Sequence, residues 1–204
     1  MCRKLRCIVI FLLFFSLPSL IFAQDDPSVE TDWDNYEYDL YSAGDQTFMI
    51  SLGMVIPLAF THNGNTIKNN IEPPIGGKGS LVYNYFLASN FFVGGEFAGM
   101  FMPTLQQDTL YFILIGARAG TQFIAGRFEF PIAASVGMIW HIYRNDRYYG
   151  LYLKGGGSAF FRATSSWAFG LSAFYYWIPQ WTEKGYKDID GHFMDITFSA
   201  RYHF

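Results

Sequence analysis

Hydrophobic and polar residues alternate strictly at the C-terminal end of the chain. From Met194 to Phe204 every even-numbered position is apolar or aromatic, and every odd-numbered position is polar or charged. A period of two predicts a β-strand with one apolar and one polar face. A soluble sheet packs its apolar face against a core, whereas a transmembrane barrel strand turns that face to lipid and its polar face to the lumen.

Seven further segments keep this pattern and are bounded by turn-forming residues. The eight expected strands are 46–60, 77–88, 91–104, 110–123, 127–142, 150–163, 167–179 and 192–204. Within each strand all charged side chains share one face, as Lys154 and Arg162 do. A lipid-facing charge costs about 2–4 kcal/mol at the bilayer midplane. The pattern therefore predicts an all-β fold, an eight-stranded antiparallel transmembrane β-barrel over residues 46–204.

The connections between the expected strands alternate in length. Those after the second, fourth and sixth strands are short, at 89–90, 124–126 and 164–166. Those after the first, fifth and seventh are longer, at 61–76, 143–149 and 180–191. Outer-membrane barrels have short periplasmic turns and longer outer loops. Both ends of the barrel domain are therefore expected on the periplasmic side.

Aromatic residues make up one residue in five and gather near the strand ends. The set expected at the outer interface is Phe60, Phe101, Trp140 and Trp177, and the set expected at the periplasmic interface is Phe91, Phe123, Phe128, Trp167 and Phe204. Two such belts are typical of proteins that cross a membrane.

The N-terminus has the layout of a secretory signal peptide. Arg3, Lys4 and Arg6 precede an apolar stretch at 8–22, and Ala23-Gln24 is a suitable cleavage site. Fifteen residues are short for a transmembrane helix, which needs about 20, although an uncleaved anchor stays an alternative. Both cysteines of the chain lie in the signal at 1–23, so the exported protein would have none.

Residues 24–45 form an acidic segment with eight Asp and Glu residues and no Lys or Arg. Removing the three positive charges of the signal takes the net charge from −3 to −6. We interpret the segment as a solvated, flexible periplasmic tether. Asp32, Asp34 and Asp39 lack the glycine and terminal glutamate of an EF-hand loop, so no metal site is expected. An acidic stretch also argues against nucleic acid as a partner.

Residues 46–204 as a whole resemble the small eight-stranded outer-membrane barrels. Thr197, Ser199, Tyr202 and Phe204 resemble the C-terminal signal read by the outer-membrane assembly machinery, with Ser199 where glycine is usual. The resemblance implies a location in the outer membrane of a Gram-negative-type envelope. It implies outer-membrane lipid and the assembly machinery as partners, and we expect a monomer.

No enzyme motif stands out in the sequence, and we expect neither an enzyme nor a cofactor. Gly-x-Ser-x-Gly, His-Glu-x-x-His and a nucleophilic cysteine of the exported chain are missing. His141 and His192 lie near the expected outer rim, but two isolated histidines are more often surface residues than metal ligands. Eight strands leave an interior that side chains fill or that holds one small ligand. This argues against a general diffusion pore.

The expected lumen face changes character along the barrel. Toward the periplasm it carries a candidate ion-pair plug of Glu96, Arg118, Glu129, Arg162 and Arg201. Toward the outside it turns apolar, with candidate ligand-binding residues Val55, Met100, Phe112, Leu114, Ile139, Phe174, Tyr176, Ile178 and Phe193. Unpaired charges in the periplasmic half of the lumen would be costly. The outer half is either a pocket for a small hydrophobic molecule or a packed, solvent-excluding lumen.

Three prolines, Pro57, Pro103 and Pro131, lie in or at the end of expected strands, where each should interrupt pairing. The strand prolines and the apolar outer lumen resemble the OmpW-like subfamily, in which a proline-associated break lets a hydrophobic molecule pass sideways into the membrane. That resemblance implies a narrow channel or binder for small hydrophobic molecules. The alternative is a closed barrel of the OmpX or OmpA membrane-domain kind, whose extracellular loops contact host or surface ligands.

Overall fold

The protein is a closed antiparallel barrel of eight long strands, with one short additional strand. The computed structural model describes residues 41–62, 65–67, 75–103, 109–143, 146–180 and 189–204. The strands are β1 (Gln46–His62), β2 (Asn65–Ile67), β3 (Gly76–Ala88), β4 (Phe91–Pro103), β5 (Thr109–Ala125), β6 (Phe128–Tyr143), β7 (Asp146–Arg162), β8 (Trp167–Gln180) and β9 (Ile189–His203). The signal peptide and residues 24–40 of the acidic segment lie outside this range.

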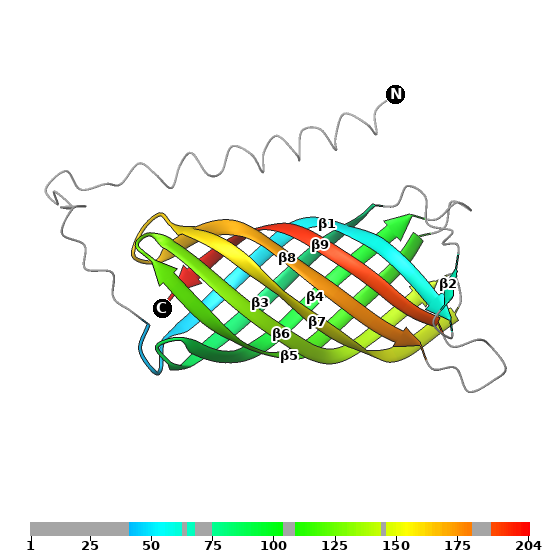
Figure 1. Ribbon diagram of the computed structural model, residues 1–204, viewed down its shortest axis with the longest axis horizontal. Helices are drawn as coiled ribbons and strands as arrows, with labels where there is room; N and C mark the ends of the chain where they lie inside the picture. Colours follow the sequence, from blue (N-terminus) through cyan, green and yellow to red (C-terminus); the bar gives the residue numbers. More distant parts are fainter. Residues whose placement is uncertain (1–40, 63–64, 68–74, 104–108, 144–145, 181–188) are drawn as a thin grey trace, which may run out of the picture. The chain divides into compact units, whose positions relative to one another are not determined.

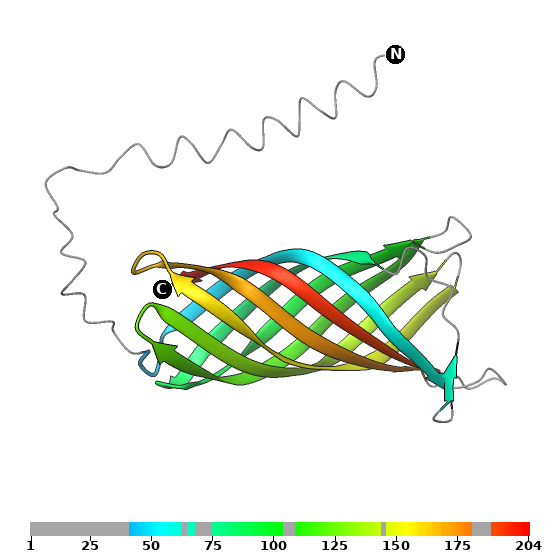
Figure 2. The ribbon, with the colours of Figure 1, turned by 45° about the horizontal axis from the view of Figure 1, so that its top comes forward.

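Barrel closure comes from the pairing of the first and last long strands. Consecutive long strands pair from β1 through β3 to β9, and β9 returns to β1 from Thr47–His203 to Thr61–Asp190. Figures 1 and 2 show the tilted strands wrapping around one axis. The prediction of an all-β, eight-stranded antiparallel barrel is thus confirmed. Within the described ranges no helix is long and apolar enough to cross a bilayer.

The strand β2 lies in the segment that the sequence predicts to be a long loop. Its three residues pair with the end of β1, from Phe60–Ile67 to His62–Asn65. A three-residue strand is too short to show a period of two. The eight barrel strands otherwise agree with the predicted ranges, except that β7 begins at Asp146 rather than at 150.

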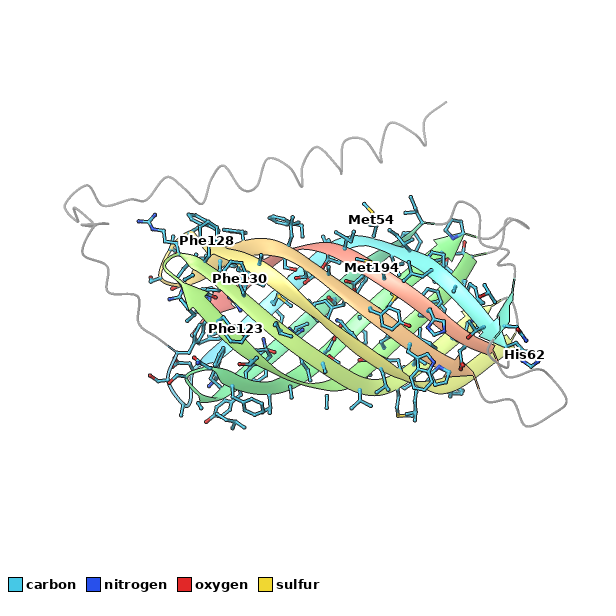
Figure 3. The ribbon with its side chains drawn as sticks, in the orientation of Figure 1. Met54, His62, Phe123, Phe128, Phe130 and Met194 are labelled. Atoms are coloured by element: carbon cyan, nitrogen blue, oxygen red, sulfur yellow. The ribbon has the colours of Figure 1, made fainter. Side chains whose placement is uncertain are left out.

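The C-terminus lies at the same end of the barrel as the connections at 89–90, 126–127 and 163–166, and the other connections leave the opposite end (Figure 1). We call these the inner and outer ends. The connection predicted to be long at 143–149 spans only residues 144–145, because β6 and β7 pair as far as Tyr143 and Asp146. Figure 3 labels Phe123, Phe128 and Phe130, which project at the inner end. All three are exposed on the outer wall. An aromatic girdle at this end is the arrangement expected of a barrel in a bilayer.

The outer wall is apolar along the middle of the barrel, and the charged side chains that the structure describes at this height face the lumen. Leu52, Phe97, Ile132 and Leu171 are exposed, whereas Lys78, Glu96 and Arg118 are buried. This distribution is inverted relative to a soluble protein, whose buried side is the apolar one. It is the distribution that the segregation of charges in the sequence predicts.

A bulge in β1 reverses the facing of the residues that follow it. The pairing with β9 shifts between Pro57 and Ala59. Phe60, predicted to join the outer aromatic belt, therefore turns into the lumen, where its ring lies 5.6 Å from that of Phe193. The belt prediction is wrong for Phe60 because one extra residue exchanges the two faces of a strand.

The other two prolines behave differently from each other. Phe130 and Pro131 of β6 have no partners in the pairing with β7, which resumes in the same register at Ile132 and Gly157. Pro103 is the last residue of β4 and pairs with Thr109. Pro57 and Pro131 therefore interrupt their ladders as predicted, whereas Pro103 ends its strand.

Candidate functional site: a lumen in three levels

The lumen side chains occupy three levels along the barrel, and the middle one is charged. Glu96, from the centre of β4, lies 2.5 Å from Lys154 Nζ of β7 and 4.0 Å from Lys78 Nζ of β3. The Ser135 hydroxyl donates a hydrogen bond to its second oxygen at 3.3 Å. One carboxylate thus interacts with two lysines from opposite sides of the closed wall.

A second carboxylate completes this level. Asp195 of β9 forms an ion pair with Lys78 and accepts a hydrogen bond of 2.6 Å from the Tyr176 hydroxyl. Lys78 also donates to Tyr176 at 2.6 Å. We call Lys78, Glu96, Lys154, Tyr176 and Asp195 the mid-lumen cluster. All five are buried, so pairing offsets a desolvation cost that would otherwise be several kcal/mol per ion.

The inner level is built around one carboxylate. Glu129 of β6 forms ion pairs with Arg162 and Arg201. The Gln122 amide donates to Glu129 at 3.2 Å and accepts from Arg201 at 3.1 Å. We call these four residues, with Tyr41, the inner cluster.

Tyr41 reaches the inner cluster from the segment before β1. Its hydroxyl donates to Glu129 at 3.0 Å and lies 2.7 Å from His203 Nδ1. Its ring stacks on Phe86 at 4.1 Å. The interpretation of residues 24–45 as solvated therefore fails for Tyr41, which is buried in the inner mouth of the barrel.

The five residues of the predicted plug do not form one network. Glu129, Arg162 and Arg201 lie together, but Glu96 belongs to the mid-lumen cluster. Arg118, expected to pair with Glu96 or Glu129, is in none of the ion pairs between described residues. Its Cζ instead lies over the rings of Phe92 and Phe174, at 5.6 and 5.4 Å from their centroids.

The prediction left out Lys78, Lys154 and Asp195, although the sequence pattern places all three on the lumen face. Charge parity would have included them, because Lys154 and Asp195 share a face with Arg162 and Arg201, and Lys78, the only charge of its strand, lies opposite the face of Leu81 and Leu87. Their pairing partners come from strands far apart in the chain, as in Lys78–Asp195, which are 117 positions apart in the sequence. Such a contact depends on barrel tilt and closure.

The outer level is apolar and densely packed. All nine candidate ligand-binding residues are buried on the lumen side. A cavity of about 40 Å³ remains near the outer end, lined by Phe60, Leu110, Phe112, His141, Ile178, Gly191 and Phe193. Pockets for small molecules are usually about 300–1,000 Å³. Phe174 and Tyr176 do not belong to this level, since Lys154 Nζ lies 4.2 Å from the centroid of the Phe174 ring and Tyr176 joins the mid-lumen cluster.

The residues of the predicted assembly signal divide between the two faces of β9. Thr197 and Ser199 face the lumen, and the Ser199 hydroxyl lies 2.7 Å from that of Ser51 and 3.1 Å from that of Ser172. Tyr202 and Phe204 lie on the outward face, with ring centroids 5.0 Å apart. Recognition by an assembly machinery stays a prediction.

The two histidines near the outer end lie on opposite faces of the wall. His141 faces the lumen, with its ring 5.1 Å from that of Phe112. His192 faces outward, 2.5 Å from the Tyr175 hydroxyl and 3.2 Å from that of Thr61. The two therefore do not converge on one site.

A long groove crosses the outer wall, a feature that the sequence reasoning missed. Two adjacent rows of outward-facing residues line it, one of Tyr83, Gly95, Ala117, Val136, Leu153 and Trp177, and the other of Tyr85, Val93, Ala119, Ala134, Gly155 and Tyr175. The groove holds about 1260 Å³. Small residues form its floor and aromatic residues both its ends. The register alone determines that these small residues lie side by side.

Comparison with known proteins places the fold. The structure is similar to Neisserial surface protein A (TM-score 0.58, 10% identity, 79% of this chain and 97% of that one). It is also similar to the outer membrane protein OprG from Pseudomonas aeruginosa (TM-score 0.50, 11% identity, 80% and 97% covered). At these identities the likeness concerns the fold, which is that of small outer-membrane barrels.

Sequence comparison finds relatives in one organism. Two proteins of Treponema pallidum (strain Nichols), both described as uncharacterized, match at 31% identity over 84 residues and 25% over 129 residues. The matches span 40% and 63% of this chain, and 29% and 59% of those relatives. A protein-family model matches residues 24–202. The chain therefore belongs to the family that this model describes, and it has the fold of the small eight-stranded outer-membrane β-barrels.

Proposed function

We propose that the protein is a closed outer-membrane barrel that acts through its outer, surface-facing end rather than by passing solutes through its lumen. The observation that carries this proposal is the filling of the lumen at all three levels. Among the described residues, the apolar level surrounds a cavity of about 40 Å³, and paired charges occupy the levels below it. This is the adhesin-type or structural alternative of the two hypotheses from the sequence.

Electrical conductance tests the proposal directly. The purified protein, refolded and inserted into planar bilayers, should show no stable conductance steps. Glu129→Gln leaves Arg162 and Arg201 without a carboxylate, and it should introduce flickering conductance as the inner cluster loosens. Steady conductance by the unmodified protein would contradict a closed lumen.

A second function, binding of a long apolar chain to the outer wall, is favoured by the groove. The row from Tyr83 to Trp177 crosses six strands, and its five spacings of about 4.8 Å give a length of about 24 Å along the curved wall. The groove is apolar along its floor and lies on the membrane-facing wall. Its natural occupant is the acyl chain of a lipid or fatty acid, because such a chain is apolar, flexible and already dissolved in the bilayer.

Two glycine substitutions distinguish this second function from general lipid contact. A Cβ added at Gly155, on the groove floor, or at Gly99, outside the groove, meets no atom within 4 Å. Gly155→Leu should fill the groove and reduce quenching of the nearby tryptophan Trp177 by a bromine-labelled fatty acid, whereas Gly99→Leu should leave the quenching unchanged. Equal behaviour of the two variants would argue against a groove-specific ligand.

A further inference from the structure

The described lumen contains more positive than negative charge. Its cations are Lys78, Arg118, Lys154, Arg162 and Arg201, and its anions are Glu96, Glu129 and Asp195. The mid-lumen cluster is balanced, with two lysines and two carboxylates, whereas the inner cluster has two arginines for one carboxylate, and Arg118 adds one further cation. A charge held away from water is costly unless a charge of opposite sign lies near it. The excess therefore points to a counter-ion that the side chains do not supply.

Arg118 is the group that this excess leaves without a partner. Its side chain is buried, with 4% of the residue exposed, and its Nε and Nη1 have no hydrogen-bond partner. The carboxylates of the mid-lumen cluster form ion pairs with lysines, Glu96 with Lys154 and Asp195 with Lys78, and neither forms an ion pair with Arg118, although Asp195 Oδ1 is also buried without a hydrogen-bond partner. Buried polar groups in proteins are nearly always hydrogen-bonded. Two unpaired N–H donors on a buried cation are thus the signature of a missing acceptor.

The surroundings of Arg118 stabilise its charge without using its donors. The rings of Phe92 and Phe174 present their faces to the guanidinium. This contact is a cation–π interaction, which favours a positive charge but offers no acceptor to an N–H group. The donors of a guanidinium lie in its plane and suit a small planar or spherical anion.

A third free donor lies in the same part of the lumen. The Tyr152 hydroxyl is buried without a hydrogen-bond partner. It lies against Gly116, two residues before Arg118 on β5, where a Cβ would collide with it. Glycine at this position therefore gives the tyrosine room to reach toward the strand that carries the arginine.

We propose that Arg118 and the Tyr152 hydroxyl form a lumen site for one small monovalent anion of the size of chloride or nitrate. The ligand must be small because Phe92, Leu114 and Phe174, which line this region, are themselves buried and closely packed. It must be charged because a water molecule would satisfy the donors but leave the excess positive charge in place. The site is independent of the groove and of the proposed surface function.

Anion-dependent stability tests the site on the full chain in detergent micelles. At constant pH and ionic strength, replacing gluconate by chloride should raise the midpoint of heat unfolding in a saturable way, and nitrate should do the same. Arg118→Met keeps the length of the side chain but removes the charge, and it should abolish this dependence. Arg127→Met, which removes an arginine at the β5–β6 turn, should keep it, and Tyr152→Phe should shift saturation to higher chloride concentration.

Locating the ion in a crystal completes the test, and this experiment needs only the unmodified protein. Crystals of the unmodified protein grown in bromide should show an anomalous peak within hydrogen-bond distance of Arg118. The proposal would be overturned if the unfolding midpoint did not respond to the anion, or if Arg118→Met kept the response. It would also be overturned if the crystals showed a fully occupied water, and no bromide, at this position.

Discussion

The mid-lumen and inner clusters each pair two lumen cations with carboxylates, but they contain different numbers of carboxylates. The mid-lumen cluster has two, Glu96 and Asp195, each with its own lysine. The inner cluster has one, Glu129, which holds both Arg162 and Arg201. Loss of one acid in the first leaves a second in place, whereas loss of Glu129 leaves none. Burial alone therefore does not predict how much each acid contributes to stability, because the number of cations that depend on it also matters.

The largest effect is expected for Glu129→Gln. It removes the charge from the inner cluster while leaving Arg201 buried, and breaking a buried ion pair costs about 3–5 kcal/mol. We expect a loss of about 4 kcal/mol in the free energy of unfolding, measured by urea titration in micelles. If Glu129→Gln lost less unfolding free energy than Glu96→Gln, the expected difference between the two clusters would be wrong.

Glu96→Gln should have the second largest effect. It leaves Lys154 without an ion-pair partner among the described residues, but Lys78 keeps Asp195. The expected loss is about 3 kcal/mol in the same urea titration. Gln122→Leu, which removes a neutral hydrogen-bonding member of the inner cluster without loss of an acid, gives the comparison for an uncharged change, and it should cost less than either substitution.

Tyr41→Phe tests a difference between the two clusters that comes from a residue outside the strands. None of the described residues before β1, which are 41–45, forms a hydrogen bond or ion pair with the mid-lumen cluster, whereas the inner cluster receives the Tyr41 hydroxyl. A hydrogen bond to a charged group contributes about 1.5–3 kcal/mol, and the stacking on Phe86 is kept in the variant. We expect a loss of about 1.5 kcal/mol and faster proteolytic removal of the segment before β1. An unchanged rate of cleavage would show that the hydroxyl does not hold the segment.

The smallest effect is expected when both members of a pair are replaced together. Glu96→Leu combined with Lys154→Met replaces both charges by apolar side chains, and Met fills much of the space of the lysine stem. Replacing a buried ion pair by apolar groups is often nearly neutral, so we expect a loss below about 1 kcal/mol. A loss equal to the sum of the two single variants would show that the residues do not act as a pair.

The sequence by itself determined the architecture of this protein. Charges and apolar residues alternate with a period of two, which is a local property of each strand. From Met194 to Phe204 that alternation alone assigns every residue to a face, and the structure agrees. The same reasoning placed Lys78, Lys154 and Asp195 in the lumen without saying what they touch.

Only the tertiary structure decided which side chains meet. The Lys78–Asp195 pair depends on the tilt of the strands and on the closure of β9 onto β1. The turn of Phe60 into the lumen depends on one bulged residue, which reverses the alternation from that point. The isolation of Arg118 follows because Glu96 and Asp195 are satisfied by lysines from other strands. The alternation and polarity of a strand are set by its own residues, whereas pairing across a lumen depends on register, tilt and closure together.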